Sequence, residues 1–320
     1  MAPGFVDGPL VECVPNFSEG RDPHIIASIA RAAAAVPGVL ILDLQTDPDH
    51  NRCVLTFAGP PEAVVEAAVE AAGAAAQLID MNRQTGVHPR IGAADVVPFV
   101  PLSGVTLDEC VTLARSAGEQ HWRRHGVPVY FYDAASLRSD RTRLEQIRKG
   151  GFALLKKVVL TDDYRRPDIG GPALHPTAGA SIFGARKLLI AYNVNLQTGH
   201  VEVAKRIARQ IRASSGGFPG VKALGVYLAT RGLAQVTTTV TDFELSPLHV
   251  VFNAIRDAAA RESVAIAGSQ LIGLLPRRAL EAAGGTEFQW ECWDDSMILE
   301  NRLAMAAAGE FRVPELSRHP

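Results

Sequence analysis

The spacing of apolar residues alternates between two periods along the first part of the chain, which predicts strands alternating with helices. Apolar residues at helical spacing around Val64, Ala68 and Ala72 predict a long helix. Asp22 before Pro23 is a favourable start for an earlier helix. The predicted order is strand, helix, two strands and helix, over residues 10–14, 23–35, 39–44, 53–58 and 60–78.

The same order of elements returns in the second part of the chain. A strand, a helix, two strands and a helix are predicted over residues 187–196, 199–213, 223–228, 234–240 and 247–261. Thr230-Arg231-Gly232 has the composition of a hairpin turn. The duplicated pattern predicts two related α/β halves, each a sheet with helices packed on one face. We place the domains at residues 1–188 and 189–320.

Two segments stand outside this pattern. Residues 161–184 are rich in glycine and proline, which is typical of a linker or of a ligand-binding loop. A loop of this length in a compact protein is usually functional or disordered, and we favour a functional loop. Residues 287–308 are predicted to form a closing helix, in which Trp290 and Trp293 serve packing.

The composition is ordinary for a globular protein with ample material for a core. Of 320 residues, 47% are hydrophobic, and the net charge of -2 gives no basic field for nucleic acid or an anionic membrane. Residues 1–8 lack the pattern of a signal peptide, and no apolar run is long enough to span a bilayer. Cys13, Cys53, Cys110 and Cys292 form no zinc or disulfide spacing. We therefore expect a cytoplasmic protein with reduced, mostly buried thiols.

The segment Gly86-Val87-His88-Pro89-Arg90-Ile91-Gly92 carries the strongest candidate for chemistry. Pro89 disfavours helical backbone at His88, and the flanking glycines allow sharp turns close to a ligand. His88 is therefore expected on a stiff connection before the apolar run 94–100, where catalytic groups are often carried. Its ordinary pKa of about 6.5 suits proton transfer at neutral pH. The local pattern fits equally a histidine that only hydrogen-bonds its loop.

A second pair of histidines has the spacing of a metal site but lacks its other features. His121 and His125 lie four residues apart on one face of a predicted helix. No glutamate stands between them as in the His-Glu-x-x-His pattern. We interpret both as exposed residues near the helix end at Gly126, and we predict no metal site.

Several blocks of residues resemble the glutamate formimidoyltransferase family. Val11–Gly20 resembles the family's opening signature, and Gly86–Gly92 resembles the segment around its catalytic histidine. Further matches are Asp95–Pro101, Gly184–Lys187, Leu233–Val236 and Gly268–Leu274. These blocks follow the family's order from residue 10 to about 285. The chain is too short for the cyclodeaminase domain of animal members, so we expect a stand-alone transferase.

The resemblance implies a fold and a reaction. The fold is two α/β subdomains whose sheets face one another across a folate-binding tunnel, in a homodimer. The reaction moves the formimidoyl group of N-formimidoyl-L-glutamate to N5 of tetrahydrofolate, in histidine degradation. His88 matches the family's catalytic histidine, and one group near neutral pKa serves both proton steps as general base and then acid. Tetrahydrofolate is a co-substrate in this reaction, and no metal is required.

The resemblance also points to binding residues. The predicted folate-binding segment is Gly170, Gly171, Pro172, Ala173, Leu174, His175, Pro176, Thr177, Ala178 and Gly179. The predicted substrate contacts are Asn16, Arg52, Arg90, Tyr132, Arg186 and Asn195. Among these the tyrosine matches a family residue, the arginines suit two-point pairing with carboxylates, and the amides lie near strand ends. Structural roles in turns, core or surface remain open for each of them.

Two alternative functions use the same observations. A formyl-transferring enzyme acting with 5-formyltetrahydrofolate and glutamate would use the same site, and the sequence does not separate it from the first. A non-catalytic module of the RNA-binding kind shares the order of elements. Such a module needs a basic face and exposed aromatic residues on the sheet. An aromatic content of 6% and a slightly negative charge disfavour it.

Overall fold

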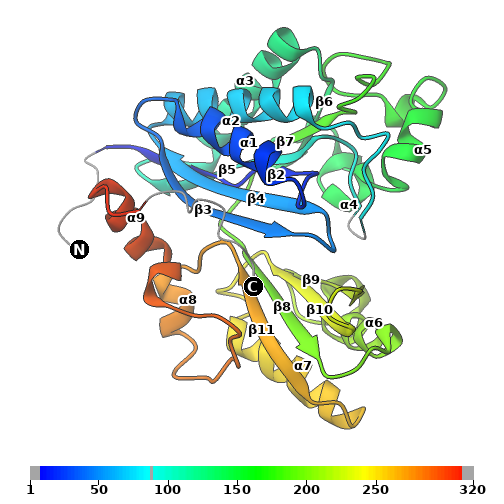
Figure 1. Cartoon of the computed structure of the whole chain (residues 1–320), viewed down its shortest axis with the longest axis vertical. Coiled ribbons are helices and arrows are strands. Elements are labelled where there is room, and N and C mark those ends of the chain that lie inside the picture. The colour runs from blue at the N-terminus through cyan, green and yellow to red at the C-terminus, as the bar shows by residue number, and fades with distance from the viewer. Residues whose placement is uncertain (1–7, 87–88, 312–320) are drawn as a thin grey trace. The chain divides into compact units, whose positions relative to one another are not determined.

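The computed structural model describes residues 8–86 and 89–311 (Figure 1). This part of the chain forms two compact units, of which the first ends at Arg186 and the second runs from Lys187 to Met305. The described residues from Ala306 on group with the first unit. Each unit has its own hydrophobic core. No helix in residues 8–86 or 89–311 is long and apolar enough to cross a membrane.

A seven-stranded mixed sheet forms the centre of the first unit. Its strands are β1 (Leu10–Cys13), β2 (Asn16–Phe17), β3 (Leu40–Asp47), β4 (Arg52–Gly59), β5 (Ala94–Ser103), β6 (Val129–Asp133) and β7 (Ser181–Ala185). In space β3 pairs with β4, β4 with β1 and β2, and these two with β5, all antiparallel. Strands β7 and β6 extend the β5 edge in parallel.

Helices cover one face of this sheet (Figure 1). They are α1 (Pro23–Ala34), α2 (Pro61–Leu78) and α3 (Leu107–His125). The shorter α4 (Leu144–Ile147) and α5 (Gly151–Val158), after β6, pack in a smaller core with Tyr130, Tyr132 and Ile182 on the other face of the sheet. Asp22 starts α1 as predicted, because its carboxylate accepts a hydrogen bond from the backbone N–H of His24 at 2.8 Å. Thr106 and Glu109 form a capping box that starts α3.

Alternation along the strands sorts side chains between the two faces of the sheet. On β1, Val11 and Cys13 are fully buried in the core shared with the helices. Glu12 stands between them and therefore belongs to the opposite face. On β4, Phe57 packs in the same core, and its neighbour Thr56 belongs to the opposite face. The face away from the helices thus carries polar residues on its central strands.

A four-stranded antiparallel sheet forms the centre of the second unit. Its strands are β8 (Ile190–Leu196), β9 (Val221–Leu228), β10 (Leu233–Val240) and β11 (Ile266–Ile272), and its helices are α6 (Val201–Ile211), α7 (Leu248–Arg261), α8 (Arg277–Glu281) and α9 (Leu299–Ala307). The predicted hairpin joins β9 to β10, and the backbone N–H of Gly232 donates to Leu228 at 2.9 Å. Gly232 has a φ of 66°, which glycine adopts without strain.

Both units contain the same arrangement of six elements. In the first unit the order β1-α1-β3-β4-α2-β5 gives the spatial strand order β5-β1-β4-β3. In the second unit β8-α6-β9-β10-α7-β11 gives the order β11-β8-β10-β9, which is the same. This is the βαββαβ motif of ferredoxin-like folds. The duplicated pattern predicted from the sequence is confirmed, as is the assignment to two α/β halves.

Two predicted elements are corrected by the structure. Residues 161–184 end in β7, which lies inside the first sheet between β5 and β6. Residues 287–308 form a helix only from Leu299, because Trp290 makes a β-bridge with Ser269 on β11. Trp290 and Trp293 stack at 5.2 Å between ring centres against the second core, so their predicted packing role is confirmed.

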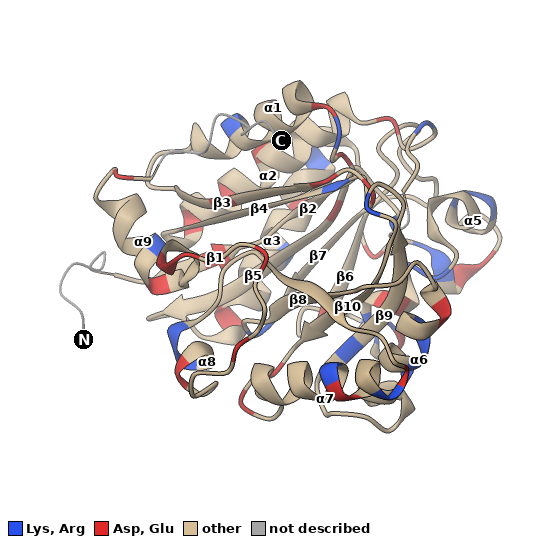
Figure 2. Ribbon diagram, turned by 60° about the horizontal axis from the view of Figure 1, so that its bottom comes forward, with Lys and Arg blue, Asp and Glu red and all other residues tan. Residues whose placement is uncertain are grey.

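Charged residues of both signs intermingle on the helices and loops, and the strands are mostly uncharged (Figure 2). This mixture agrees with the small net charge of -2. Among the cysteines, Cys13, Cys53 and Cys110 are buried and Cys292 is exposed, all with free thiols. The prediction of mostly buried thiols is therefore confirmed.

Candidate active site

The loop predicted to carry catalysis lies between α2 and β5. Val87 and His88 lie outside the described residues, so the role of His88 stays a prediction. The residues on either side of them are described, and both ends of the loop are fixed by hydrogen bonds from distant parts of the chain. These anchors define the surroundings of the predicted catalytic residue.

Asn51 holds the residues that lead into the loop. Its amide oxygen accepts a hydrogen bond from the backbone N–H of Gly20 at 2.9 Å. Its amide nitrogen donates to the carbonyl of Thr85 at 2.9 Å and to Oε1 of Gln84. Gln84 donates in turn to Glu19 at 2.9 Å. Asn51 has a φ of 45°, a conformation that asparagine tolerates better than most residues. One side chain thus joins three separate segments.

Arg90 fastens the loop to the turn between β3 and β4. Its side chain donates hydrogen bonds to the backbone carbonyls of Asn51, at 2.7 Å, and His50. Arg90 is buried, and burial lowers the pKa of its guanidinium. A Cβ at Gly86 would overlap this guanidinium, which explains the glycine at that position. These contacts are structural, and the predicted pairing of Arg90 with a substrate carboxylate stays a prediction.

The far end of the loop joins β5 through a buried ion pair. The backbone N–H of Ile91 donates to Asp95 at 2.7 Å, and the other oxygen of this carboxylate pairs with Arg148 at 2.5 Å. The hydroxyl of Ser18 donates to the carbonyl of Gly92 at 2.7 Å. A buried charge pair whose oxygens are all engaged holds the backbone in one arrangement.

The predicted folate-binding segment, residues 170–179, runs beside this end of the loop. Gly179 and Gly92 form an antiparallel β-bridge, and the backbone N–H of Ala93 donates to Ala178 at 2.9 Å. A Cβ on either glycine would overlap a carbonyl oxygen of the opposite segment. The two segments singled out by the resemblance are therefore in direct backbone contact.

His175 closes a tight turn in that segment. The backbone N–H groups of His175 and Gly179 donate to each other's carbonyl at 2.9 and 3.1 Å. Nδ1 of the His175 ring accepts a hydrogen bond from the N–H of Ala178 at 3.0 Å, which requires that this nitrogen carry no proton. Burial lowers the pKa of His175 and so favours the neutral ring. Residues 171–173, 176 and 177 are exposed, so part of the segment is open to a ligand.

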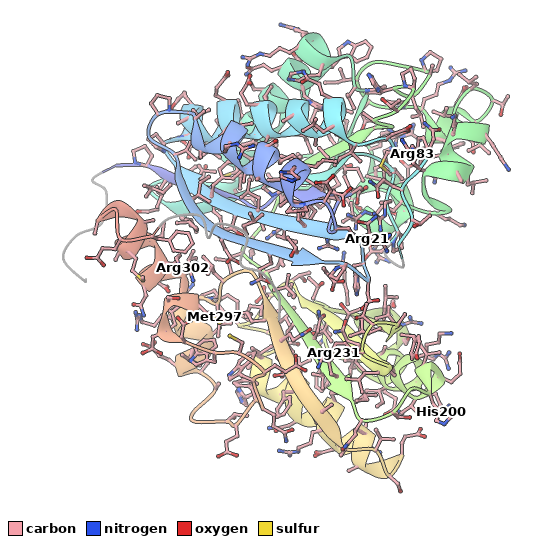
Figure 3. The ribbon with its side chains drawn as sticks, viewed as in Figure 1. Arg21, Arg83, His200, Arg231, Met297 and Arg302 are labelled. Carbon is pink, nitrogen blue, oxygen red and sulfur yellow. The ribbon has the colours of Figure 1, made fainter. Side chains whose placement is uncertain are left out.

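A hollow of about 570 Å³ opens beside the Asn51 contacts. It is lined by Glu19, Arg21, Asp22, Pro23, His24, Asn51, Arg83 and Gln84. Figure 3 labels Arg21 and Arg83, the two cations of this lining. Its volume falls in the range of small-molecule sites, and its lining is polar. The hollow could hold a charged group next to the start of the loop.

Tyr132 and Arg186 lie together on the sheet face away from α1, α2 and α3. Burial raises the pKa of Tyr132, and the nearby charge of Arg186 opposes the rise. The Tyr132 ring lies over Gly184 on the neighbouring strand, where a Cβ would overlap it. Arg52 lies at the start of β4, and burial, reinforced by the charge of Arg148, lowers its pKa to about 10. The structure thus gathers three predicted substrate contacts in one unit.

The two predicted asparagines lie in different units. Asn16 on β2 donates to a nearby backbone carbonyl at 2.9 Å. Asn195 on β8 is fully buried, donates to Glu291 at 2.7 Å and accepts a hydrogen bond from Gln235 at 2.9 Å. Arg231, labelled in Figure 3, pairs with Glu291 through two hydrogen bonds of 2.8 and 2.9 Å. Asn195 therefore belongs to a polar cluster within the second unit.

The sequence did not reveal the anchors of the loop. Asp95 had a signal, because a carboxylate at the start of the apolar run 94–100 needs a partner. Arg148, which supplies that partner, lies 53 positions away, and no local pattern marks it. Gln84 carried no signal, and Glu19 belonged to a block with a family pattern that gave it no role of its own. Their roles come from contacts that form only in the folded chain.

The two histidines of α3 are not exposed residues, contrary to the prediction. His121 is fully buried with Nε2 3.2 Å from the hydroxyl of Ser181, and burial lowers its pKa to about 3. The ring of His125 lies against Gly73 of α2, where a Cβ would overlap it, and burial lowers its pKa as well. Both rings pack inside the unit because β7 and α2 close over this face of the helix.

The fold and the anchored loops define a chain of two βαββαβ units with a candidate small-molecule site in the first. The chain belongs to the formiminotransferase family. The family's formiminotransferase domain, N-terminal subdomain, matches residues 10–186. The formiminotransferase domain matches residues 191–307. The searched residues, 8–86 and 89–311, contain no group of three or more His, Cys, Asp or Glu side chains that could hold a metal ion.

Named relatives cover nearly the whole chain. It is 40% identical to glutamate formimidoyltransferase of Streptococcus pyogenes serotype M1, over 92% of this chain and 98% of that protein. It is 42% identical to glutamate formimidoyltransferase of Thermoplasma acidophilum, over 93% and 98%. It is 46% identical to formimidoyltransferase-cyclodeaminase of Sus scrofa, over 96% of this chain but 58% of that protein.

Proposed function

We propose that this chain transfers the formimidoyl group of N-formimidoyl-L-glutamate to N5 of tetrahydrofolate, which gives 5-formimidoyltetrahydrofolate and L-glutamate. The observation that carries the proposal is the identity of 40% and 42% to two glutamate formimidoyltransferases over 98% of each relative. The reaction belongs to histidine degradation and one-carbon metabolism. Tetrahydrofolate acts in it as a co-substrate, and the proposal needs no metal.

His88 is the proposed general base and acid. It takes the proton from N5 as N5 attacks the formimidoyl carbon, and it returns a proton to the departing glutamate nitrogen. The contacts of Asn51 and Arg90 before and within the loop, and of Asp95 after it, support this role. They hold both ends of the loop. A catalytic base that is held in the correct orientation increases the rate of reaction.

Residues 170–179 are the proposed folate-binding segment. Their backbone contact with Gly92 supports this proposal, because it joins the segment to the loop that carries the base. Arg52, Arg90 and Arg186 are proposed for substrate carboxylates, with Asn16, Tyr132 and Asn195 as further contacts. The proposal assigns the family's two subdomains to residues 1–188 and 189–320.

The proposal extends to assembly and compartment. The family resemblance implies a homodimer, and the free, mostly buried thiols favour the cytoplasm. Light scattering coupled to gel filtration tests the dimer, and a monomer mass at micromolar concentration would contradict that part alone. The proposed transfer activity is tested independently, because the activity assay does not depend on whether the protein is a dimer.

The decisive test is transfer by the purified chain with N-formimidoyl-L-glutamate and tetrahydrofolate. The proposal predicts turnover for the wild type and a loss of about 100-fold or more for His88→Ala, with the fold retained by circular dichroism. His200→Ala, at an exposed histidine of the second unit labelled in Figure 3, is the matched control with wild-type turnover. Wild-type turnover by His88→Ala would contradict the role of His88.

A second donor pair separates the alternative function. The formyl-transferring enzyme predicts faster turnover with 5-formyltetrahydrofolate and glutamate than with the formimidoyl donor. The proposed function predicts the reverse order. Absence of turnover with both pairs would overturn the assignment to one-carbon transfer.

A further inference from the structure

Glu12 is a buried carboxyl group that no described residue satisfies. It lies on β1 in the middle of the first sheet, between β4 and β5, and only 5% of it is exposed. Within residues 8–86 and 89–311 its carboxyl group makes no hydrogen bond or ion pair. A buried carboxyl group without a partner costs folding free energy, because it loses its hydrogen bonds to water. A buried carboxyl group of this kind is a candidate for a functional site.

The groups around Glu12 form a polar band on the sheet face away from α1, α2 and α3. Glu12 pairs with Val100 on β5, and the backbone N–H of Arg186 donates to Phe99, beside Val100, at 3.1 Å. Alternation places Glu12 and Arg186 on the same face, on either side of β5. Tyr132, on β6 beside β7, continues the band, and the charge of Arg186 acts on its pKa.

A second unsatisfied atom lies on the same face. Thr56 on β4 is 1% exposed, and its hydroxyl has no hydrogen-bond partner in the described part of the chain. Ala58, two residues further along β4, pairs directly with Glu12, so Thr56 is a diagonal neighbour of Glu12. Two adjacent polar groups that lack partners indicate a shared ligand more strongly than either does alone.

We propose that Glu12 is a substrate-binding residue whose carboxylate receives two adjacent N–H groups of a planar N–C–N unit, with Thr56 beside it. The proposal deepens the proposed function and rests on it. A carboxylate has two oxygens in one plane, and it pairs with two parallel N–H donors in two-point fashion. Hydrogen-bond donors of a substrate suit the position beside the Glu12 carboxylate. A substrate carboxylate would be repelled by Glu12 and attracted to Arg186.

Both substrates of the proposed reaction contain such a unit. The formimidoyl group is an amidine, and the pyrimidine ring of the pterin has an amino group beside a ring N–H. The shared chemistry is an N–C–N edge with two N–H groups, and binding experiments tell the two sources apart. The formyl donor has a carbonyl oxygen in place of the imino group, so it lacks the first of these units.

The acid–base behaviour of Glu12 agrees with this role. Burial raises its pKa to about 7, and the charge of Arg186 opposes the rise. The other titratable groups of the band are Tyr132 and Asp43, which pairs with Thr56 from β3. The direct partners of Glu12 on β4 and β5, Ala58 and Val100, carry no charge. N–H donors favour the charged carboxylate and lower its pKa. Binding of the ligand near neutral pH should therefore release protons.

Calorimetry with each substrate alone tests the proposal. The proteins are the wild type, Glu12→Gln, Thr56→Val and the control Glu119→Gln, which changes an exposed carboxylate on α3. Glu12→Gln should weaken one substrate by about tenfold to a hundredfold, the usual effect of losing a charge-assisted hydrogen bond. Thr56→Val should weaken the same substrate by a smaller factor, and Glu119→Gln should bind as the wild type does.

The substrate affected identifies the source of the N–C–N unit. Weaker binding of tetrahydrofolate alone assigns the pterin, and weaker binding of N-formimidoyl-L-glutamate alone assigns the amidine. In both cases the wild type should release protons on binding that substrate, measured from the heat in buffers of different ionisation enthalpy. Glu12→Gln should release fewer.

Wild-type affinity of Glu12→Gln for both substrates would overturn the proposal, and so would a lower melting temperature with unchanged binding, which marks a purely structural carboxylate. If Glu12→Gln does not fold, wild-type affinity of Thr56→Val for both substrates overturns it. Failure of the proposed function is distinguished by the wild type, which would then show no transfer with either donor pair.

Discussion

Gly92 and Gly179 face one another in an antiparallel β-bridge, so the loop of the predicted base and the predicted folate segment share one backbone contact. Neither position accepts a Cβ without moving a carbonyl of the other segment. The contact is backbone to backbone, and it does not depend on a flexible side chain. A shift of one segment should therefore displace the other.

The first prediction concerns this contact. Gly92→Ala should lower the free energy of unfolding by about 1–3 kcal/mol, as overpacking does, and should also weaken binding of tetrahydrofolate. Gly216→Ala is the control, because Gly216 has open space around it and a φ of 86°. It should cost about 1–2 kcal/mol through backbone strain and leave folate affinity unchanged. Equal folate affinity of Gly92→Ala and the wild type in calorimetry would contradict the coupling.

The second prediction concerns the anchor at Asn51. Asn51→Ala removes hydrogen bonds to Gly20, Gln84 and Thr85 and leaves buried groups unsatisfied, which should cost about 1–3 kcal/mol in urea unfolding. Turnover should fall because the loop loses its orientation. Asn51→Gly tolerates the φ of 45° and should be more stable than Asn51→Ala by about 1 kcal/mol, with the same loss of turnover. Full turnover by both variants would rule out a positioning role.

The third prediction is a loss of stability in mild acid. In the unfolded chain His121 binds a proton as pH falls below about 6.5, whereas burial keeps the folded pKa at about 3. The unfolded state then binds more protons, so stability is complete above about pH 6.5 and is lost as pH falls. The loss should approach about 1.4 kcal/mol per pH unit. Burial shifts the pKa of His125 and His175 in the same direction.

Urea unfolding at about pH 7.5 and about pH 5.5 measures this loss. His121→Gln removes the titrating ring and should make the free energy of unfolding depend less steeply on pH in this range. His200→Gln, at an exposed histidine, should leave the dependence unchanged. An identical pH dependence for His121→Gln and the wild type would show that His121 is not buried as described.

The fourth prediction concerns the thiols. Cys292 is exposed, whereas burial raises the pKa of Cys53 to about 12 and that of Cys110 to about 11. The pKa of Cys13 is also raised by burial. Thiolate is the reactive form, so one thiol should react rapidly with an aromatic disulfide reagent in native protein, and all four in urea. Cys292→Ser should abolish the rapid phase; a second rapid thiol would contradict the buried core.

The regular elements could be predicted because their signals are local. Asp22 and Pro23 start a helix wherever they stand before an apolar period, and the hairpin at Gly232 follows from its turn residues. Strand β7 was missed because its five residues follow a glycine- and proline-rich loop, and only pairing with β5 and β6 makes it a strand. The helix predicted from 287 begins late because Trp290 pairs with β11.

The candidate site also has parts that the sequence predicted and parts that depend on long-range contacts. Residues 86–92 and 170–179 carried a family pattern, and the structure brings their described parts together. Glu12 lies in the block that resembles the family's opening signature, but its burial was not predicted, because a polar residue that alternates with apolar ones in a strand predicts a solvent-facing position. Its burial depends on the pairing of β1 with β4 and β5, which forms only in the folded chain. Long-range contacts of this kind are absent from any local pattern.

The matching strand orders of the two units bear on the history of the chain. Copying and fusing one ancestral module of about half this size would leave the six-element order that both units share. After such an event the two copies are free to diverge. The extra strands β2, β6 and β7, with α3, belong to the first unit. The predicted general base, His88, and the predicted folate-binding segment both belong to the first unit. The specialised chemistry would therefore have been acquired in the unit with the larger sheet, while the second unit kept the four-stranded sheet.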